Sequence, residues 1–398
     1  MKKPKRLVKK PNFLVWYLLG PLVILWYRLK IKLRRINRPK IRKRSLVIAP
    51  HRCYFDVLTL PIAIYPYRGH FVSTSYWYRR KWLGHLLDIM GCIKKDQYKS
   101  DVQAIKQMQD CFKRNERVFM YPEGQMSVDG RSQIIVPGIE KLVKKYKVNV
   151  YFVNTEGSYL IGPKWHQSLV KGRLNATTTL VVDENDIDNL STEEIKNRID
   201  DAFKMNYDFE WMKEHRDYKY RGKNKAEHLD RVILECPHCH KEDTLKAEGL
   251  KLYCSDCNFE VEFEKNSYFF KPNEFGIDNP GDLFDFYEEK IRKDVIDNVV
   301  YEDEMKLVSY PGVDPINLPH THVKMDNEFI TFSGEGCDEI KIVLDKVINF
   351  VCTIGMSFEV PTPECTYRIY VDEKRVNHII DYWYRIKALK ERSNEGKN

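Results

Sequence analysis

His51 and Asp56 are the two side chains of this sequence best suited to proton transfer. They lie five positions apart in APHRCYFDVLTL, residues 49–60, after the apolar run Ser45–Ala49. A carboxylate that accepts a hydrogen bond from one ring nitrogen of a histidine leaves the other nitrogen able to deprotonate a hydroxyl. Five residues exceed one helical turn, so the chain must bend for the two to meet. A capped helix with a solvated aspartate is the alternative, and the pair alone favours it.

A second polar cluster follows another apolar run. The segment MYPEGQMSVDGR, residues 120–131, comes after a predicted strand at 117–121. By itself it is typical of a turn. However, Gly124 lets backbone N–H groups approach a ligand closely, and Ser127 and Arg131 supply donors for a phosphate. Because both clusters follow strands of one predicted sheet, we expect them to meet at the same edge of that sheet.

The elements that position these clusters alternate between strand and helix. Strands are predicted at 45–49, 71–75, 117–121, 148–154 and 174–182, and helices at 101–114, 139–146 and 191–205. The last helix begins with a capping box, Ser191 with Glu194. Alternation of this kind predicts an α/β domain.

Four ordered blocks in this domain resemble the glycerolipid acyltransferases of the bacterial 1-acylglycerol-3-phosphate acyltransferase type. The blocks are His51-x4-Asp56, Gly91-Cys-Ile-Lys-Lys, Tyr121-Pro-Glu-Gly124, and residues 148–154 with Glu156-Gly157. The resemblance implies that His51 deprotonates an acceptor hydroxyl, that Asp56 orients His51, and that the alkoxide attacks an acyl thioester on CoA or acyl carrier protein. It also implies that Glu123 and Gly124, with basic residues, hold the phosphate of a lysophospholipid, most simply 1-acylglycerol-3-phosphate.

Three positions depart from the family pattern. Pro50 stands in place of the usual Asn, Gln125-Met126 in place of Thr-Arg or a similar pair, and Lys94, Lys95 and Asp96 follow Gly91-Cys-Ile where an Arg is usual. Lys95, Arg131 and Arg52 are candidates to replace these arginines, although lysine lacks bidentate geometry. The alternative hypothesis is a non-catalytic, membrane-associated scaffold that keeps the fold and binds a lipid or a protein.

The N-terminal region is strongly basic. Residues 1–44 contain sixteen Lys or Arg and no acid, so the net charge of +9 leaves −7 for the rest of the chain. A basic block predicts an anionic partner, either a phospholipid surface or nucleic acid. The same block contains FLVWYLLGPLVILWY, residues 13–27. Such an apolar run fits a membrane and has no use in binding nucleic acid, so we expect no nucleic-acid partner.

The apolar run is short for a membrane span. A spanning helix needs about 20 residues, and Gly20-Pro21 predicts a break in the middle. We therefore expect a segment that dips into one leaflet at the cytoplasmic face of an anionic membrane, with a spanning helix and a signal peptide as alternatives. The segment STSYWYRRKWLGHLL, residues 73–87, combines aromatic side chains with Arg79, Arg80 and Lys81. It is either core or a further interfacial patch.

Four of the ten cysteines form two close pairs, Cys236-x2-Cys239 and Cys254-x2-Cys257. Two such knuckles complete a tetrahedral Zn²⁺ site, and a closed four-thiolate site leaves no open position for catalysis. We therefore predict a structural zinc. The remaining cysteines are scattered, which indicates a reducing compartment.

The length of 398 residues indicates two or three domains. We predict a basic membrane anchor at 1–44, an acyltransferase domain at 45–211, a charged linker at 212–230, a zinc ribbon at 231–265 and a β-rich domain at 275–398. The β-rich domain is expected to contain a helix at 284–297, strands at 329–334, 339–344, 347–355 and 367–372, and a final helix at 375–390. Short strands closed by one helix resemble pleckstrin-homology-like domains.

Overall fold

A computed structural model describes residues 6–96, 101–166, 168–204, 207–310, 317–335, 337–347, 350–353, 357–362, 366–370 and 379–395. The chain forms two compact units, unit 1 (1–164 and 168–221) and unit 2 (165–167 and 222–398). The boundary at 221/222 falls inside the predicted linker. Parts of the predicted anchor (1–5), of the helix at 191–205 (205), and of the C-terminal strands and helix (348–349, 354–355, 371–372, 375–378) lie outside the described residues.

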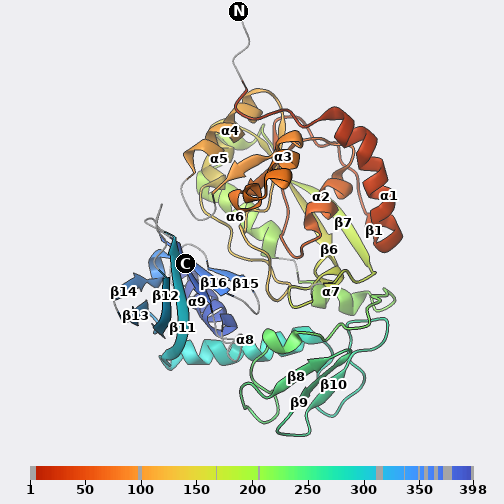
Figure 1. Cartoon of the computed structure of the whole chain (residues 1–398). Coiled ribbons are helices and arrows are strands. Elements are labelled where there is room, and N and C mark those ends of the chain that lie inside the picture. The colour runs from red at the N-terminus through yellow and green to blue at the C-terminus, as the bar shows by residue number, and fades with distance from the viewer. Residues whose placement is uncertain are drawn as a thin grey trace, which may run out of the picture. The chain divides into compact units, whose positions relative to one another are not determined.

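Unit 1 is built on a seven-stranded sheet with the order β1-β7-β6-β2-β5-β3-β4 (Figure 1). The strands are β1 (Lys32–Arg35), β2 (Ser45–Ile48), β3 (His70–Thr74), β4 (Ile93–Lys95), β5 (Arg117–Met120), β6 (Asn149–Glu156) and β7 (Arg173–Val182). Neighbouring strands are parallel except β6 and β7. The sequence did not predict β1 and β4, because both are short and rich in Lys and Arg.

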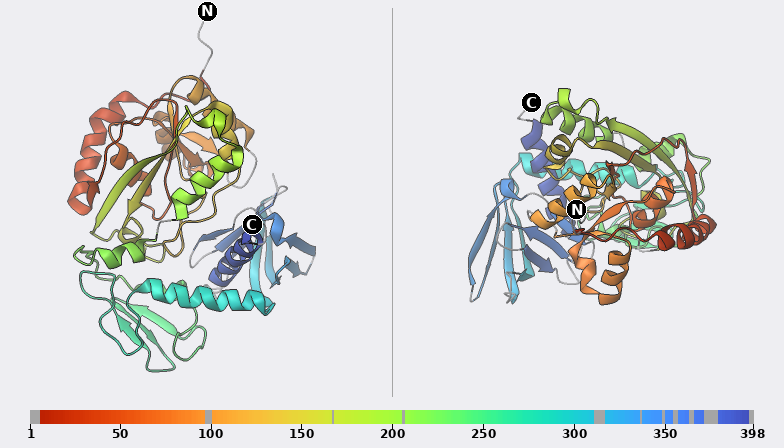
Figure 2. Two further views of the ribbon diagram at one scale, coloured as in Figure 1. Left: turned by 180° about the vertical axis from the view of Figure 1, so that it is seen from behind. Right: turned by 90° about the horizontal axis from the view of Figure 1, so that it is seen from above.

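Helices cover both faces of this sheet (Figure 2). They are α1 (Gly20–Lys30), α2 (Asp56–Ile64), α3 (Lys81–Ile89), α4 (Val102–Lys113), α5 (Ile139–Tyr146), α6 (Thr192–Lys204) and α7 (Asp208–Glu214). Leu46 and Ile48 of β2 pack in one apolar cluster with residues of α4, α5 and α6. Val47 and Ala49 point the other way, into a cluster with α2 residues and Trp16. All four residues of β2 are therefore buried, as expected for a strand covered on both sides.

The predicted break at Gly20-Pro21 is wrong. A π-helix, η1 (Val15–Leu19), leads directly into α1, and the Gly20 N–H donates to the carbonyl of Val15. Pro21 occupies the first turn of α1, where its missing N–H removes no helical hydrogen bond. None of the helices within the described ranges is both long enough and apolar enough to cross a bilayer.

The N-terminal region is attached to unit 1 before and after this helix. Val8 is buried in the apolar cluster that contains Leu46 and Ile48 of β2. The Asn12 N–H donates to the carbonyl of Ile89. The hydroxyl groups of Tyr27 and Thr59 lie 2.7 Å apart, which joins α1 to α2. Beyond α1, the strand β1 pairs with β7.

Part of the basic block is neutralised inside unit 1. Arg42 lies 3.1 Å from Asp183, and Arg44 lies 2.6 Å from Glu184. Arg35 donates to backbone carbonyls that follow or lie within α2. Some of the sixteen Lys and Arg residues therefore already have partners within unit 1. Fewer of them are available to an anionic partner than the net charge of the block implies.

Unit 2 combines a three-stranded antiparallel ribbon, a long helix and a seven-stranded antiparallel sheet. The ribbon strands are β8 (Leu245–Glu248), β9 (Lys251–Cys254) and β10 (Glu260–Glu262), followed by α8 (Pro280–Ile296). The sheet has the order β14-β13-β12-β11-β17-β16-β15, with β11 (Tyr301–Tyr310), β12 (Asn317–Met325), β13 (Phe329–Gly334), β14 (Cys337–Val343), β15 (Val351–Thr353), β16 (Ser357–Pro361) and β17 (Thr366–Tyr370). The helix α9 (Ile379–Glu395) follows the sheet. The strands β11, β12 and β16 were not predicted, since each mixes polar or Pro residues with its apolar positions.

The helix α8 joins the parts of unit 2. Its N-terminus is capped by Asn279 with Asp282 in a capping box, and Lys290 lies 2.7 Å from Glu242 of the ribbon. Tyr287 hydrogen-bonds to Asp381 of α9. Through these contacts α8 links the ribbon to the β-rich segment within unit 2.

Glu116 connects the N-terminal region to the sheet. Its Oε2 accepts hydrogen bonds from Arg6 Nη2 at 2.5 Å and from His70 Nε2 at 3.1 Å. His70 is buried, and its Nδ1 lies 2.7 Å from the carbonyl of Gly91. Burial raises the pKa of Glu116, but the hydrogen bonds from His70 and Arg6 lower it by more, to about 2.

Because the folded-state pKa lies below the ordinary 4.5, the contribution of Glu116 to stability is complete above pH 4.5 and is lost as the pH falls toward 2. We predict that Glu116→Gln destabilises the protein at neutral pH, and that its difference in unfolding free energy from wild type shrinks over this acid range. Urea unfolding at a series of pH values measures this, with Glu193→Gln at an exposed position of α6 as the control. A difference that stays constant with pH would contradict the assignment.

Candidate active site

His51 and Asp56 meet because the chain turns between them. Residues 49–55 form no regular helix, and α2 begins at Asp56 itself. Asp56 Oδ2 lies 3.1 Å from His51 Nδ1. In this arrangement Nδ1–H donates to the carboxylate and Nε2 is the acceptor. The imidazole is 24% exposed, whereas the carboxylate is 2% exposed, so solvent reaches the His51 ring and not the Asp56 carboxylate.

The turn also fixes the orientation of the Asp56 carboxylate. Its Oδ2 accepts the backbone N–H groups of Arg52 at 2.6 Å and Cys53 at 2.7 Å. The Cys53 thiol lies 3.4 Å from the other oxygen, and burial raises the pKa of this thiol well above its usual value, so it remains a donor. The Asp56 carboxylate is therefore bonded by four donors: two backbone N–H groups, the Cys53 thiol and the His51 imidazole. Among these groups, the imidazole is exposed to solvent.

Tyr121 supports the imidazole from β5. Its ring stacks on the ring of His51 with centroids 4.5 Å apart, and its hydroxyl donates to the backbone carbonyl of Asp56 at 2.7 Å. Burial raises the pKa of Tyr121 well above its usual value, so the hydroxyl stays protonated. No role for Tyr121 was predicted from the sequence. Its position immediately after β5, at the edge where His51 follows β2, was the signal that pointed to one.

Glu123 clamps the two polar clusters together. One carboxylate oxygen accepts the His51 N–H at 2.6 Å, and the other accepts the Gln133 N–H at 2.6 Å. In return, the Ser127 N–H donates to the carbonyl of His51 at 2.8 Å. The clusters thus meet at one edge of the sheet, as expected. Burial raises the pKa of Glu123 to about 7 against the opposing effect of the two N–H groups.

Arg52 has an internal role in place of the predicted contact with substrate. Its side chain is 1% exposed, and its guanidinium donates to Asp208 at 2.6 Å and to the Thr155 carbonyl at 3.2 Å. Asp208 also accepts the N–H groups of Gly157 and Tyr159. A buried guanidinium paired in this way cannot turn toward a phosphate without leaving a buried charge alone. No signal in the sequence indicated Asp208, which lies far along the chain.

Ser127 is likewise committed to its own loop. The side chain is buried, its hydroxyl donates to the Arg131 carbonyl at 2.7 Å, and it accepts the Gly130 N–H at 2.8 Å. The predicted donation from this hydroxyl to a phosphate would break that turn. The Arg131 guanidinium lies over the ring of Tyr207 at 4.6 Å and is 21% exposed.

Gly124 and Lys95 lie at the same edge of the sheet. Gly124 has φ of +69°, a conformation that suits glycine, and its N–H donates to the Tyr121 carbonyl. Lys95 ends β4, and its Nζ lies 3.0 Å from the Asp96 carbonyl. Burial lowers the pKa of Lys95. The strand order separates β4 from β2 by three inter-strand spacings, about 14 Å, so Lys95 borders the site at some distance from His51.

The four cysteines of the two knuckles converge in unit 2. The Sγ atoms of Cys236 and Cys257 lie 3.7 Å apart, those of Cys239 and Cys254 lie 3.8 Å apart, and all four lie within 4.8 Å of one another. A tetrahedral site with Zn–S bonds of about 2.3 Å requires sulfur separations of about 3.8 Å, so the donor set fits zinc. His240 lies outside the cluster, 2.9 Å from Glu235.

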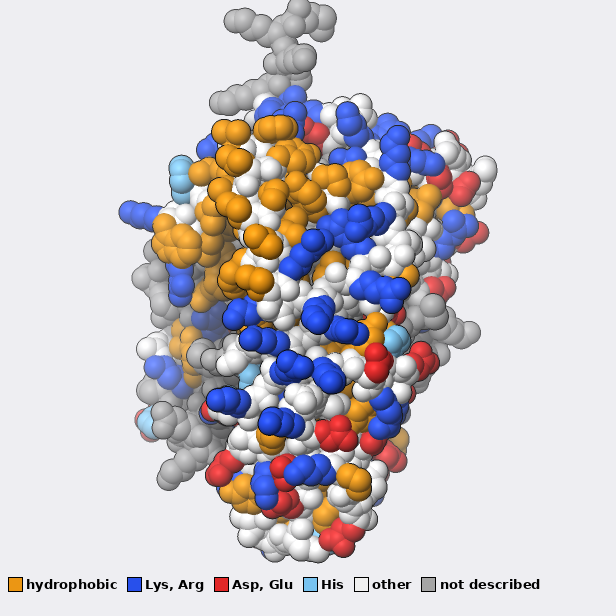
Figure 3. Space-filling model, turned by 90° about the vertical axis from the view of Figure 1, so that its right-hand side faces the viewer, with side chains coloured by type: hydrophobic (Ala, Val, Ile, Leu, Met, Phe, Trp, Pro, Cys, Tyr) orange, Lys and Arg blue, Asp and Glu red, His pale blue; other side chains and the backbone are white. Residues whose placement is uncertain are grey.

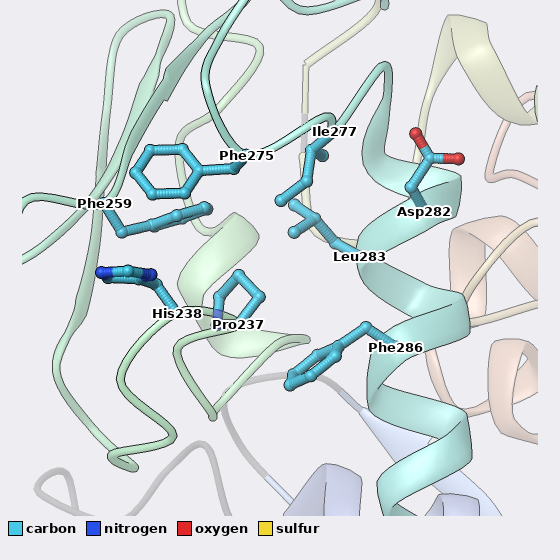
Figure 4. Close-up of a pocket in the computed structure, with 8 residues that line it drawn as sticks. All are labelled: Pro237, His238, Phe259, Phe275, Ile277, Asp282, Leu283 and Phe286. Carbon is cyan, nitrogen blue, oxygen red and sulfur yellow. The ribbon is translucent and has the colours of Figure 1, made fainter.

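An apolar pocket of about 390 Å³ lies beside one knuckle (Figure 4). Its wall consists of Pro237, His238, Phe259, Phe275, Ile277, Asp282, Leu283 and Phe286. The Asp282 carboxylate already accepts the N–H groups of Asp278 and Asn279. The pocket therefore offers an apolar surface and contains none of the residues predicted to act on a substrate.

The clamp by Glu123 yields a test. Glutamine keeps one acceptor but turns an N–H₂ group toward a backbone N–H, so Glu123→Gln should displace the loop that carries His51. Misplacement of a reactive group by about 1 Å costs roughly 100-fold in rate. We predict a fall of that order in kcat with little change in KM, measured by transfer of a labelled acyl group. Glu193→Gln, the same exchange at an exposed position of α6, is the control, and a Glu123→Gln enzyme with wild-type kcat would contradict the clamp.

Comparison with known proteins finds a family match for the region that contains this site. A sequence model described as Acyltransferase matches residues 30–155, which contain His51, Asp56 and Glu123. The chain is also similar to the crystal structure of the 1-acyl-sn-glycerophosphate (LPA) acyltransferase PlsC from Thermotoga maritima. That likeness has 19% identity and a TM-score of 0.40 over 47% of this chain and 74% of the other. The solution structure of the N-terminal PH domain of human ARAP2 is similar at 23% identity and a TM-score of 0.19, over 24% of this chain and 82% of the other.

The matched region holds the histidine, the carboxylate that orients it and the loop that clamps it. The match to the acyltransferase family therefore covers residues 30–155, the part of unit 1 that contains these groups.

Proposed function

We propose that unit 1 transfers a fatty acyl group from an acyl thioester, on CoA or acyl carrier protein, to the free hydroxyl of a lysophospholipid. The favoured reaction converts 1-acylglycerol-3-phosphate to phosphatidate. The observation that carries the proposal is the hydrogen bond between His51 and buried Asp56, which leaves Nε2 accessible inside a domain of the acyltransferase family.

The chemistry follows from this geometry. His51 Nε2 takes the proton of the acceptor hydroxyl as the oxygen attacks the thioester carbonyl, and Asp56 stabilises the imidazolium that results. The carbon–sulfur bond then breaks, and the proton passes from His51 to the departing thiolate. No acyl-enzyme forms, so a single histidine serves as base and then as acid.

For the acceptor phosphate we propose the side chains of Lys95 and Arg131. Lys95 belongs to the sheet edge that carries His51, and Arg131 belongs to the loop clamped against it, whereas the Gly124 N–H already donates to the Tyr121 carbonyl. Arg52 and Ser127 are left out because their polar groups are held inside the domain. Lysine at this position supplies charge without bidentate geometry.

We further propose that α1 lies in one leaflet of an anionic membrane at the cytoplasmic face. Its outer side exposes large apolar residues, while Tyr27 faces the domain. These exposed residues are Leu22, Val23, Leu25, Trp26 and Leu29. Figure 3 shows apolar side chains gathered over one face, with Lys and Arg beside them. Exposed apolar side chains on such a helix would insert at the headgroup boundary, with Arg28 and Lys30 of its last turn near the lipid phosphates.

The proposed base yields a direct prediction. His51→Ala should lower kcat by about 10²–10⁴, since a positioned general base contributes that much. Labelled acyl-CoA and acyl carrier protein, each with 1-acylglycerol-3-phosphate, provide the assay. His322→Ala, which removes an exposed histidine of β12, is the matched control and should match wild type. A loss below about tenfold for His51→Ala would exclude His51 as the general base.

For the cysteine cluster we propose one structural Zn²⁺ held by four thiolates. Elemental analysis should then find one zinc per chain, and Cys239→Ser should lower both the zinc content and the thermal stability of unit 2. Cys352→Ser, which changes a buried cysteine outside the cluster, should leave the zinc content unchanged. Full zinc occupancy in Cys239→Ser would exclude this site.

A second candidate function is a scaffold without catalysis, and the apolar pocket beside Cys236 and Cys239 favours it. Such a pocket fits an apolar side chain of a protein partner. Purified protein that binds lysolipid but turns over neither donor would support the scaffold.

A further inference from the structure

The short helix η2 (Ser75–Arg79) and the helix α3 expose several large apolar side chains. Tyr76 is 45% exposed, Trp77 41%, Trp82 67% and Leu86 43%. Trp82 and Leu86 lie four residues apart and so share one face of α3. The outward face of a helix on a soluble protein is normally polar. The core role that the sequence left open for these residues is therefore excluded.

The inward side of α3 packs against η2, and its last residue, Ile89, accepts a hydrogen bond from the Asn12 N–H. Gly84 is buried, and a side chain there would lie 3.3 Å from the ring of Tyr78. Burial raises the pKa of Tyr78, consistent with a ring held against the domain. Trp82 and Leu86 are thus not needed to hold α3 in place, and their exposure calls for a different contact.

The charges around this surface are mostly positive. Arg80 and Lys81 are exposed at the start of α3, and the Lys94 ammonium lies 5.6 Å from the Tyr78 ring. Asp88 is the one acid in residues 75–90. Exposed Trp and Tyr beside Lys and Arg match the chemistry of an interface with anionic headgroups.

The fold connects this surface to the active site. The helix η2 directly follows β3, at the edge of the sheet where His51 follows β2. Tyr54 and Val57, in the turn and helix after His51, are 50% and 59% exposed. Exposed apolar side chains therefore lie next to His51 in the turn and in α2, and others follow β3, which is two strands away from β2 in the sheet.

We propose that η2 and α3 form a second membrane contact of unit 1, independent of α1, and that its occupant is an anionic phospholipid bilayer. Trp82 and Leu86 enter the interfacial region, and Arg80 and Lys81 contact lipid phosphates. The inference rests on the proposed function in one respect, since contact at η2 gives a bilayer acceptor a path to His51.

Vesicle flotation of the full-length protein tests the contact. The vesicles contain equal parts of phosphatidylcholine and phosphatidylglycerol. The double variant Trp82→Ser, Leu86→Ser should lower the partition coefficient by about tenfold or more, from the apolar surface that it removes. The matched control is Ile296→Ser with Val300→Ser, two exposed apolar residues of unit 2, and it should partition like wild type.

Charge is tested separately. Arg80→Ser with Lys81→Ser should weaken partition to the mixed vesicles and leave partition to pure phosphatidylcholine vesicles unchanged. A measurement that needs no polar substitution uses lipids with brominated chains, which should quench the fluorescence of wild type more than that of Trp82→Phe. This second readout decides the matter if the double variant fails to fold.

Three results would overturn the proposal. These are unchanged partition of the folded double variant, equal quenching of wild type and Trp82→Phe, and a change confined to sedimentation, which would assign the surface to a second copy of the chain. Failure of the proposed function appears differently, as wild type that floats with vesicles but transfers no acyl group. His51→Ala should float like wild type, which separates the two ideas.

Discussion

One carboxylate oxygen, Oδ2 of Asp56, accepts hydrogen bonds from two backbone N–H groups and from the imidazole of His51. The conformation of the turn at residues 51–56 therefore determines which ring nitrogen of His51 carries the proton. If the turn opened, the aspartate would lose its donors and the histidine would lose its orientation at the same time. The remaining parts of the site, the Tyr121 ring and the Glu123 clamp, hold the same turn from the neighbouring strand.

The buried ion pair between Arg52 and Asp208 holds two loops of unit 1 together. Removing one member of a buried ion pair costs about 3–5 kcal/mol, because the other charge is left alone in a poor solvent. Arg52 and Asp208 thus tie the turn after β2 to the start of α7, while Asp208 also fixes the backbone after β6. Such pairs add little net stability, but they specify one arrangement of loops that the sheet alone would leave variable.

The parts of the fold that follow from local pattern could be predicted from the sequence. The strands β2, β5, β6 and β7 are apolar runs. The spacing of the paired cysteines predicts that their four sulfur atoms lie together. The role of Arg52 could not be predicted, because its partner Asp208 becomes a neighbour only through the fold. The break predicted at Gly20-Pro21 was wrong, because Pro21 lies in the first turn of α1, directly after η1. Whether residues 75–87 were core or surface depended on what α3 packs against, which a periodic pattern does not state.

The attachment of the N-terminal helix to unit 1 has a mechanical consequence. Val8 and Asn12 fasten the chain before η1, Tyr27 fastens α1 along its length, and β1 fastens the chain beyond it. Gly91 leaves so little room that an added side chain would lie 2.6 Å from the Lys9 carbonyl. The helix α1 is therefore fixed to unit 1 on both sides and along its length. If the helix rests in a lipid surface as proposed, its depth there sets the height of His51 above the acyl chains, so changes in bilayer thickness or headgroup packing would alter that height without any movement inside the protein.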